Sequence, residues 1–278
     1  MLTLNNFIMK KDYMLFLVLF CSVLFVQGQN RNLNDDLVAY YNFDDGTATD
    51  ISGNGHDGTI FGTVPMIDWT NGKYADFNGD YNNYIRVPHH ADLNFSDDFS
   101  ISLWANWSEI SGAKVIIAKG RDIQSNYTIR YGGDNFLLCY DGVYGHWVST
   151  SMSTTENTWH HIVGVADKTN HIMKLYIDNV LADSKYLPDF SITTTYPLVI
   201  GRHFTYASGG SAWPYPFLGK VDEIRIYNKT LTSDEIQQLY DLNNPNPSPS
   251  ASSVPLSNWS IIFAILLIGT VIWFRWFK

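Results

Sequence analysis

Residues 99–107 read FSISLWANW, and this stretch decides the fold class. Side chains of a β-strand point alternately to its two faces. Apolar residues take every second position here, at Phe99, Ile101, Leu103, Ala105 and Trp107. The positions between them hold Ser100, Ser102, Trp104 and Asn106, so the second face is not fully polar. The pattern predicts a strand with one face on a hydrophobic core.

Similar strand signals recur at short spacing along the chain. They cover residues 37–43, 84–87, 114–119, 127–131, 136–140, 147–150, 159–166, 172–177, 198–201 and 218–227. Residues 167–170, with the sequence DKTN, separate two of these strands and predict a hairpin, and Asp178-Asn179 supplies the next tight turn. Many antiparallel strands with almost no helix predict an all-β sandwich of two sheets.

One short helix is expected to close the domain. Thr232 and Glu235 have the spacing of a capping box, and Leu231 and Ile236 are placed to form a hydrophobic staple. The sequence NNP at 243–245 stops a helix, so we expect this one to run to about Asp241.

Both ends of the chain carry apolar segments outside the predicted domain. Residues 1–28 have the basic, apolar and small-residue parts of a signal peptide, although a retained N-terminal anchor is the alternative. Residues 243–255 are rich in Pro, Ser and Asn and predict an extended linker. Residues 256–277 predict a transmembrane helix with its basic end in the cytoplasm, or a processed sorting tail like those of bacterial surface proteins. Either alternative places the domain outside the cytoplasm.

The composition fits one secreted domain without a disulfide framework. The chain has 278 residues, 15% of them aromatic, a net charge of −9 and a pI near 5.2. This acidic balance, without a long Lys/Arg cluster, argues against a nucleic-acid partner. Cys21 lies in the N-terminal apolar run and Cys139 in a predicted buried strand, so we expect no disulfide in the mature domain.

Residues 50–58, DISGNGHDG, are too rich in glycine and side-chain oxygen to form a helix or a strand. The three glycines permit sharp turns, and Asp50, Ser52, Asn54 and Asp57 carry the hard oxygen ligands that Ca²⁺ prefers. A plain turn held by Asx hydrogen bonds is the alternative.

A second carboxylate comes from the last predicted strand. Alternation along VDEIRIY at 221–227 is expected to place Asp222 on the same inward face as Ile224 and Ile226. A buried carboxylate needs a cation, an arginine or several N–H donors. Because the first and last strands of a sandwich often lie together, we expect Asp222 to be able to meet the 50–58 loop. Backbone N–H groups at a chain end are the alternative partner.

Ordered landmarks over residues 37–242 resemble the LamG-like jelly roll of the concanavalin A-like lectin/glucanase superfamily. The landmarks are LVAYYNFD at 37–44, the 50–58 loop, YADFNG at 74–79, YIRVP at 84–88, FSISLW at 99–104, TWHHI at 158–162, KLYIDN at 174–179 and GKVDEIRIYN at 219–228. The resemblance implies a two-sheet jelly roll that often carries one Ca²⁺ and mainly binds carbohydrate or protein. It implies Asp50, Asn54 and Asp222 as the metal ligands.

Catalytic patterns are not apparent in the sequence. The glucanase branch of the superfamily uses two carboxylates on one strand, about 5 Å apart in retaining enzymes. Its Glu-x-Asp-x-x-Glu pattern is absent, and the four glutamates are isolated from one another, at Glu109, Glu156, Glu223 and Glu235. The pairs His89-His90 and His160-His161 suggest zinc, but adjacent strand residues point to opposite faces, so neither pair is expected to chelate an ion. We expect no enzymatic activity.

An aromatic-rich segment, residues 203–217, precedes the last strand and supplies the candidate ligand-binding residues Tyr206, Trp213 and Tyr215. Sugar rings stack on such side chains while polar groups of a loop bind the hydroxyls. The alternative is that Trp213 and Phe217 fold back over the core.

Together these features predict a secreted, membrane-tethered and non-catalytic binding module, stabilised by a structural Ca²⁺, for an extracellular glycan or surface protein. An adhesion or surface-assembly scaffold without lectin activity is the main alternative, and a glycoside hydrolase is a further one.

Overall fold

The computed structural model describes residues 32–70, 72–109, 111–121, 124–132, 135–140, 147–149, 155–187, 193–204 and 215–245. The chain divides into two compact units, residues 1–243 and 244–278. The predicted signal peptide and transmembrane segment lie outside the described residues. Within the described part, none of the helices has the length and apolar character that a bilayer crossing needs.

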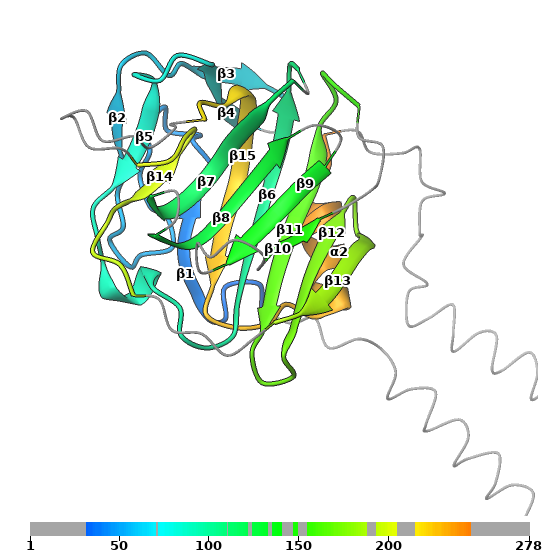
Figure 1. Cartoon of the computed structure of the whole chain (residues 1–278). Coiled ribbons are helices and arrows are strands. Elements are labelled where there is room, and N and C mark those ends of the chain that lie inside the picture. Colours follow the sequence, from blue (N-terminus) through cyan, green and yellow to red (C-terminus); the bar gives the residue numbers. More distant parts are fainter. Residues whose placement is uncertain are drawn as a thin grey trace, which may run out of the picture. The chain divides into compact units, whose positions relative to one another are not determined.

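The first unit is a sandwich of two antiparallel sheets (Figure 1). The first sheet has the order β13 (Val180–Tyr186), β12 (Ile172–Ile177), β11 (His160–Asp167), β6 (Phe99–Trp107), β15 (Leu218–Tyr227), β4 (Gly72–Asn78) and β3 (Met66–Trp69), with β1 (Leu37–Tyr41) also paired to β15. The second sheet has the order β10 (Trp147–Ser149), β9 (Asn135–Tyr140), β8 (Gln124–Gly132), β7 (Ala113–Arg121), β14 (Leu198–Ile200), β5 (Tyr84–Val87) and β2 (Thr59–Phe61). The all-β, two-sheet prediction is confirmed.

Strand β6 crosses the middle of the first sheet and is buried on both faces. Its alternate apolar side chains lie in the core between the sheets, as the sequence predicts. The other face is covered by the chain end: Ser100 Oγ donates to the carbonyl of Lys229 at 2.8 Å and accepts from the N–H of Leu231 at 2.9 Å. Trp104 stacks on Tyr240. This coverage explains why the second face of β6 is not fully polar.

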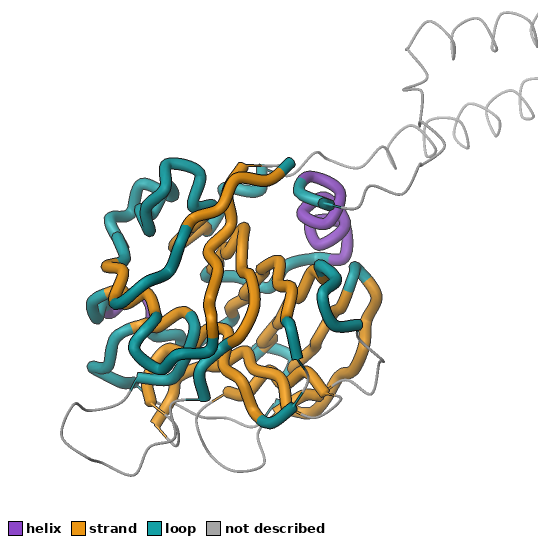
Figure 2. Tube along the Cα trace, turned by 90° about the horizontal axis from the view of Figure 1, so that it is seen from above, coloured by secondary structure: helices purple, strands orange, loops and turns teal. Residues whose placement is uncertain are grey.

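Helix α2 (Ser233–Leu242) covers that outer face and has the predicted capping box. The N–H of Glu235 donates to Thr232 Oγ1 at 3.3 Å, and the N–H of Thr232 donates to Glu235 Oε2 at 2.8 Å. Ile236 and Leu239 pack against Val163 and Val165 of β11. Figure 2 shows α2 outside the layered strands.

The predicted hairpin of β11 and β12 is confirmed, and so is the turn into β13. Asp178 and Asn179 both have positive φ, as a two-residue hairpin turn of this type requires. Four strands, β2, β3, β4 and β13, were not predicted as strands. Strand β13 is mostly exposed and its apolar side chains do not alternate with polar ones, so it pairs through its backbone without leaving a periodic signal.

Candidate functional site

The 50–58 loop runs along β1 and is fastened there by Asp50. Oδ1 of Asp50 accepts the N–H of Tyr40 at 2.9 Å and that of Ser52 at 3.0 Å, and Oδ2 accepts the N–H of His56 at 3.0 Å. Burial raises the pKa of Asp50, but these hydrogen bonds outweigh it and hold the pKa below its usual range. The carboxylate therefore stays ionised and organises the backbone of the loop.

Asn54 also ties the loop to β1. Its side-chain nitrogen donates to the carbonyl oxygens of Leu37 and Val38, each at 2.9 Å. Ser52 Oγ donates to the same Val38 carbonyl at 3.1 Å. The loop is thus a turn system built from Asx-type and serine hydrogen bonds, which is the alternative that the sequence left open.

Asp222 lies on the outer face of the first sheet, so the inward face predicted for it is wrong. Strand β15 pairs with β4 up to Val221 and with β1 from Ile224 onward, and the register with β6 shifts between Asp222 and Arg225. Glu223, at this bulge, has a φ of 54°. The extra residue reverses the alternation, so Val221, Ile224 and Ile226 face the core while Asp222 lies opposite Trp104.

Asp222 is nevertheless buried, among other acidic groups. Its Oδ1 accepts the N–H of Glu223 at 2.7 Å. Burial raises the pKa of Asp222 to about 9, and the charges of Glu223 and Asp44 add to this effect. Asp222 therefore carries a proton at neutral pH, and a cation bound there would have to displace it.

The three predicted metal ligands are not brought together. Asp50 and Asn54 share the loop beside β1, whereas Asp222 interacts with Glu223, Asp44 and the Trp69 side chain. Strand β1 pairs with β15 and separates the loop from that strand.

The glutamates of the described region have structural partners. Glu223 Oε2 accepts from the hydroxyl of Tyr40 at 2.7 Å and lies 2.7 Å from Arg225 Nη2. Glu235 caps α2 and pairs with Lys229 at 2.9 Å. Glu109 pairs with Lys114 at 3.2 Å. These contacts give each of the three a role in the fold.

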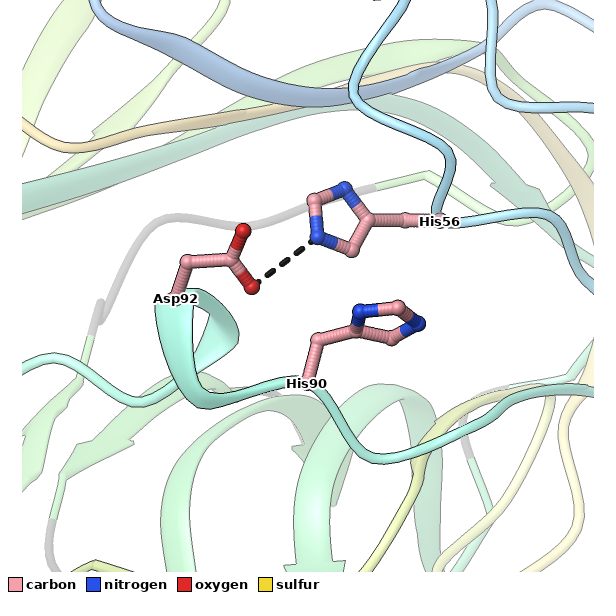
Figure 3. Close-up of side chains that lie close together, drawn as sticks. All are labelled: His56, His90 and Asp92. Carbon is pink, nitrogen blue, oxygen red and sulfur yellow. Dashed lines mark hydrogen bonds and ion pairs between the residues drawn. The ribbon is translucent and has the colours of Figure 1, made fainter.

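The structure brings two histidines and an aspartate together beside the loop (Figure 3). His56 comes from the loop, His90 is the N-cap residue of the short 3₁₀ turn Ala91–Leu93, and Asp92 lies within that turn. His89 points elsewhere and its Nδ1 lies 3.1 Å from Lys119 Nζ, so the divergence predicted for the histidine pair is confirmed. Sequence reasoning missed the cluster because His56 and His90 are far apart in the chain and no spacing rule connects them.

The aromatic segment 203–217 is described only at its two ends. Tyr206 and Trp213 lie outside the described residues. Tyr215 is half-buried, and its carbonyl accepts the N–H of Val115 at 2.9 Å. Phe217 is buried in the core against Phe77, so this residue folds inward as the alternative stated.

A further aromatic group includes the half-buried Trp69 of the edge strand β3. Trp69 packs on Trp159, with ring centroids 4.6 Å apart, and both rings contact Tyr74. This group is a second surface on which a sugar ring could stack.

Comparisons with known proteins agree with this architecture. The family model described as "Concanavalin A-like lectin/glucanases superfamily" (Laminin_G_3) matches residues 78–237. None of the curated proteins matches the chain.

Among solved structures, domain 4 of AbnA is similar. AbnA is a GH43 extracellular arabinanase from Geobacillus stearothermophilus, and the domain was solved in complex with arabinotriose. It is 26% identical, with a TM-score of 0.58, over 74% of this chain and 98% of that domain.

Two toxin structures share the fold at lower identity. The binding domain of Paraclostridial Mosquitocidal Protein 1 is 20% identical with a TM-score of 0.59, over 76% of this chain and 53% of that one. Botulinum neurotoxin type C, in a structure whose description concerns interaction with two ganglioside molecules, is 16% identical with a TM-score of 0.62, over 76% and 52%. The chain thus spans about half the length of these toxin chains.

Proposed function

Because the chain belongs to the concanavalin A-like lectin/glucanases superfamily, we propose that its sandwich is a non-catalytic module that binds carbohydrate at the cell surface. The observation that carries the proposal is the similarity to an arabinanase domain solved with arabinotriose, which extends over 98% of that domain. The structural roles of Glu109, Glu223 and Glu235 support a binding role without catalysis. The predicted signal peptide and C-terminal segment would hold the module outside the cytoplasm.

A protein ligand is the second candidate. It is favoured by the similarity to the binding domain of botulinum neurotoxin DC, solved in complex with rat synaptotagmin II and 16% identical to this chain. On this alternative the module is an adhesion or surface-assembly scaffold. A glycan array without specific binding, together with capture of one defined cell-surface protein, would favour the alternative.

We place the sugar-binding surface on the 203–217 segment, with Tyr206, Trp213 and Tyr215 as contact residues. Arabino-oligosaccharides are the first probe, followed by a wider glycan array. Trp213→Ala is expected to weaken binding roughly 30-fold, because removing an aromatic anchor of a binding site costs about 2 kcal/mol. Titration calorimetry of the full chain measures this change.

Trp69→Ala is the matched control, since it removes an indole from the second aromatic surface. Unchanged affinity in this variant supports the segment as the binding surface. If Trp69→Ala abolishes binding and Trp213→Ala does not, the ligand binds at the Trp69–Trp159 surface and our placement is wrong.

We further propose that the predicted structural Ca²⁺ uses Asp222 as a ligand. Support comes from the buried position of Asp222 beside Glu223 and Asp44, since carboxylates are the oxygen ligands that Ca²⁺ prefers. Asp50 and Asn54 already hold the loop on β1, so the ion would depend less on them than the sequence suggested.

Calcium that binds the folded state must raise its stability, by about 2.7 kcal/mol at 100 times the dissociation constant. We expect a higher melting temperature in Ca²⁺ than in chelator, and no such difference in Asp222→Asn. Asp68→Asn, at an exposed carboxylate, should melt like the wild type in both buffers. If metal analysis confirms that the chelator removes all bound ion and the melting temperature of the wild type stays constant, the protein has no structural calcium.

A further inference from the structure

We propose that His56, His90 and Asp92 form a binding site for a transition-metal ion, with Zn²⁺ as the expected ion. One ligand atom from each of these side chains lies within 4.8 Å of the other two. Figure 3 shows the three side chains grouped together, with a hydrogen bond drawn between His56 and Asp92 and the ring of His90 below that of His56. None of these three residues belongs to the proposed sugar-binding surface or calcium site, so the proposal rests on neither.

The hydrogen-bond partners of His56 favour a bound cation. Nδ1 lies 3.1 Å from the carbonyl oxygen of Val38, and Nε2 lies 2.9 Å from Oδ1 of Asp92. A carbonyl and an ionised carboxylate can only accept, whereas a neutral imidazole has a single N–H to donate. One ring nitrogen therefore faces an acceptor with its lone pair, unless the ring carries a second proton or a cation binds that nitrogen. A metal ion shared by Nε2 and Asp92 satisfies all these groups.

The surroundings of His56 hold its ring in the orientation that a metal ligand needs. Nδ1 also lies 3.3 Å from Oδ2 of Asp50, whose carboxylate is fixed by three backbone N–H groups. Metal-binding histidines commonly donate their other N–H to a carbonyl or carboxylate, which sets the tautomer and aims the free nitrogen at the ion. Because the His56 side chain is fully buried, its position changes little when an ion binds.

The other two ligands lie at the surface, where an ion can enter. The Asp92 side chain is 59% exposed, and His90 is half-buried with its ring centroid 4.6 Å from that of His56. Zinc binds imidazole nitrogen and carboxylate oxygen at about 2.0–2.2 Å, so donors around a tetrahedral ion are roughly 3.3 Å apart. His56 Nε2 and Asp92 Oδ1, 2.9 Å apart, are already near this separation, and a ring nitrogen of His90 lies within 4.8 Å of the ligand atoms of both.

The kind and number of ligands favour zinc over calcium. Two imidazoles and one carboxylate suit Zn²⁺ and its neighbours in the first transition row, whereas Ca²⁺ takes six or more oxygen ligands. Three protein ligands leave a fourth position, on the exposed side, for water or for a donor atom of a bound molecule. An ion here would also join the loop before β2 to the turn after β5.

The test is titration of the metal-free full chain with Zn²⁺, followed by calorimetry, and with Co²⁺, followed by its visible absorption. We expect one ion per chain with a micromolar or lower dissociation constant. His90→Ala and Asp92→Asn should each weaken binding at least about 10-fold. Both side chains are partly exposed, so the variants should remain folded, and circular dichroism checks this.

His89→Ala is the matched control, because it removes the neighbouring imidazole, which faces Lys119. This variant should bind zinc as the wild type does. Absence of stoichiometric Zn²⁺ binding overturns the proposal. Binding that survives unchanged in both His90→Ala and Asp92→Asn also overturns it, because the ion then lies elsewhere on the chain.

Discussion

Arg225→Ala is expected to destabilise the sandwich by about 3–5 kcal/mol, the range for breaking a buried ion pair by removing one partner. Nη2 of Arg225 lies 2.7 Å from Glu223 Oε2 and donates to the hydroxyl of Tyr40 at 2.6 Å, while the guanidinium stacks on the Tyr40 ring. Both charged side chains are more than nine-tenths buried. Alanine would leave the carboxylate of Glu223 without its cation and next to Asp222.

The burial of Glu223 makes this loss severe. Burial raises the pKa of Glu223, and the charge of Arg225 opposes that rise. Without Arg225 the folded state must either protonate Glu223 or keep an unpaired charge beside Asp222. Both outcomes lower the free energy of unfolding at neutral pH. Urea unfolding of the full chain should therefore show a lower midpoint for the variant.

Two further variants separate the ion pair from the packing of a long side chain. Arg86→Ala removes a guanidinium that stacks on Phe61, and within the described residues Arg86 forms no ion pair, so we expect a much smaller loss. The double variant Arg225→Met with Glu223→Gln should be less destabilised than the sum of its two single changes, because neither charge remains alone. If Arg225→Ala and Arg86→Ala lose equal stability, the ion pair is not what stabilises this face.

Gly219→Ala is expected to cost about 2–4 kcal/mol, from steric overlap and an unfavourable backbone conformation together. Gly219 has a φ of 150°, and a Cβ there would lie 2.2 Å from the carbonyl oxygen of Asn106 and 2.8 Å from Cα of Trp107. Both atoms belong to the backbone of β6, so no side-chain rotation relieves the contact. The two central strands of the first sheet would have to move apart.

Gly55→Ala is the matched control, since Gly55 also has positive φ, at 81°, but no atom lies within 4 Å of the added Cβ. It should cost only about 1 kcal/mol, the penalty of the left-handed conformation itself. Urea unfolding of both variants gives the comparison. If both variants lose the same free energy of unfolding, β15 can shift to accommodate the added Cβ, and its close approach to β6 does not matter for stability.

Local sequence patterns predicted the parts of the fold that depend on neighbouring residues. The alternation of 99–107 marked β6 and its core face, and the turn at Asp178-Asn179 and the capping box of Thr232 and Glu235 have the predicted geometry. Each of these features is a contact or a backbone conformation within a few residues, so the residue types are sufficient to specify it. Strand β13 had no such signal because its side chains are mostly exposed.

The sequence by itself thus determined an all-β, two-sheet sandwich closed by a short helix, and it pointed to the 50–58 loop as a structural element of that sandwich. Tertiary structure alone decided the details of the candidate sites. Asp222 lies on the outer face because β15 has a bulge where its pairing with β4 ends and its pairing with β1 begins. The alternation of residue types does not show which strands pair with β15, so it could not predict this bulge. His56 met His90 and Asp92 because the loop along β1 reaches the turn after β5, a contact that forms only when distant segments pack together.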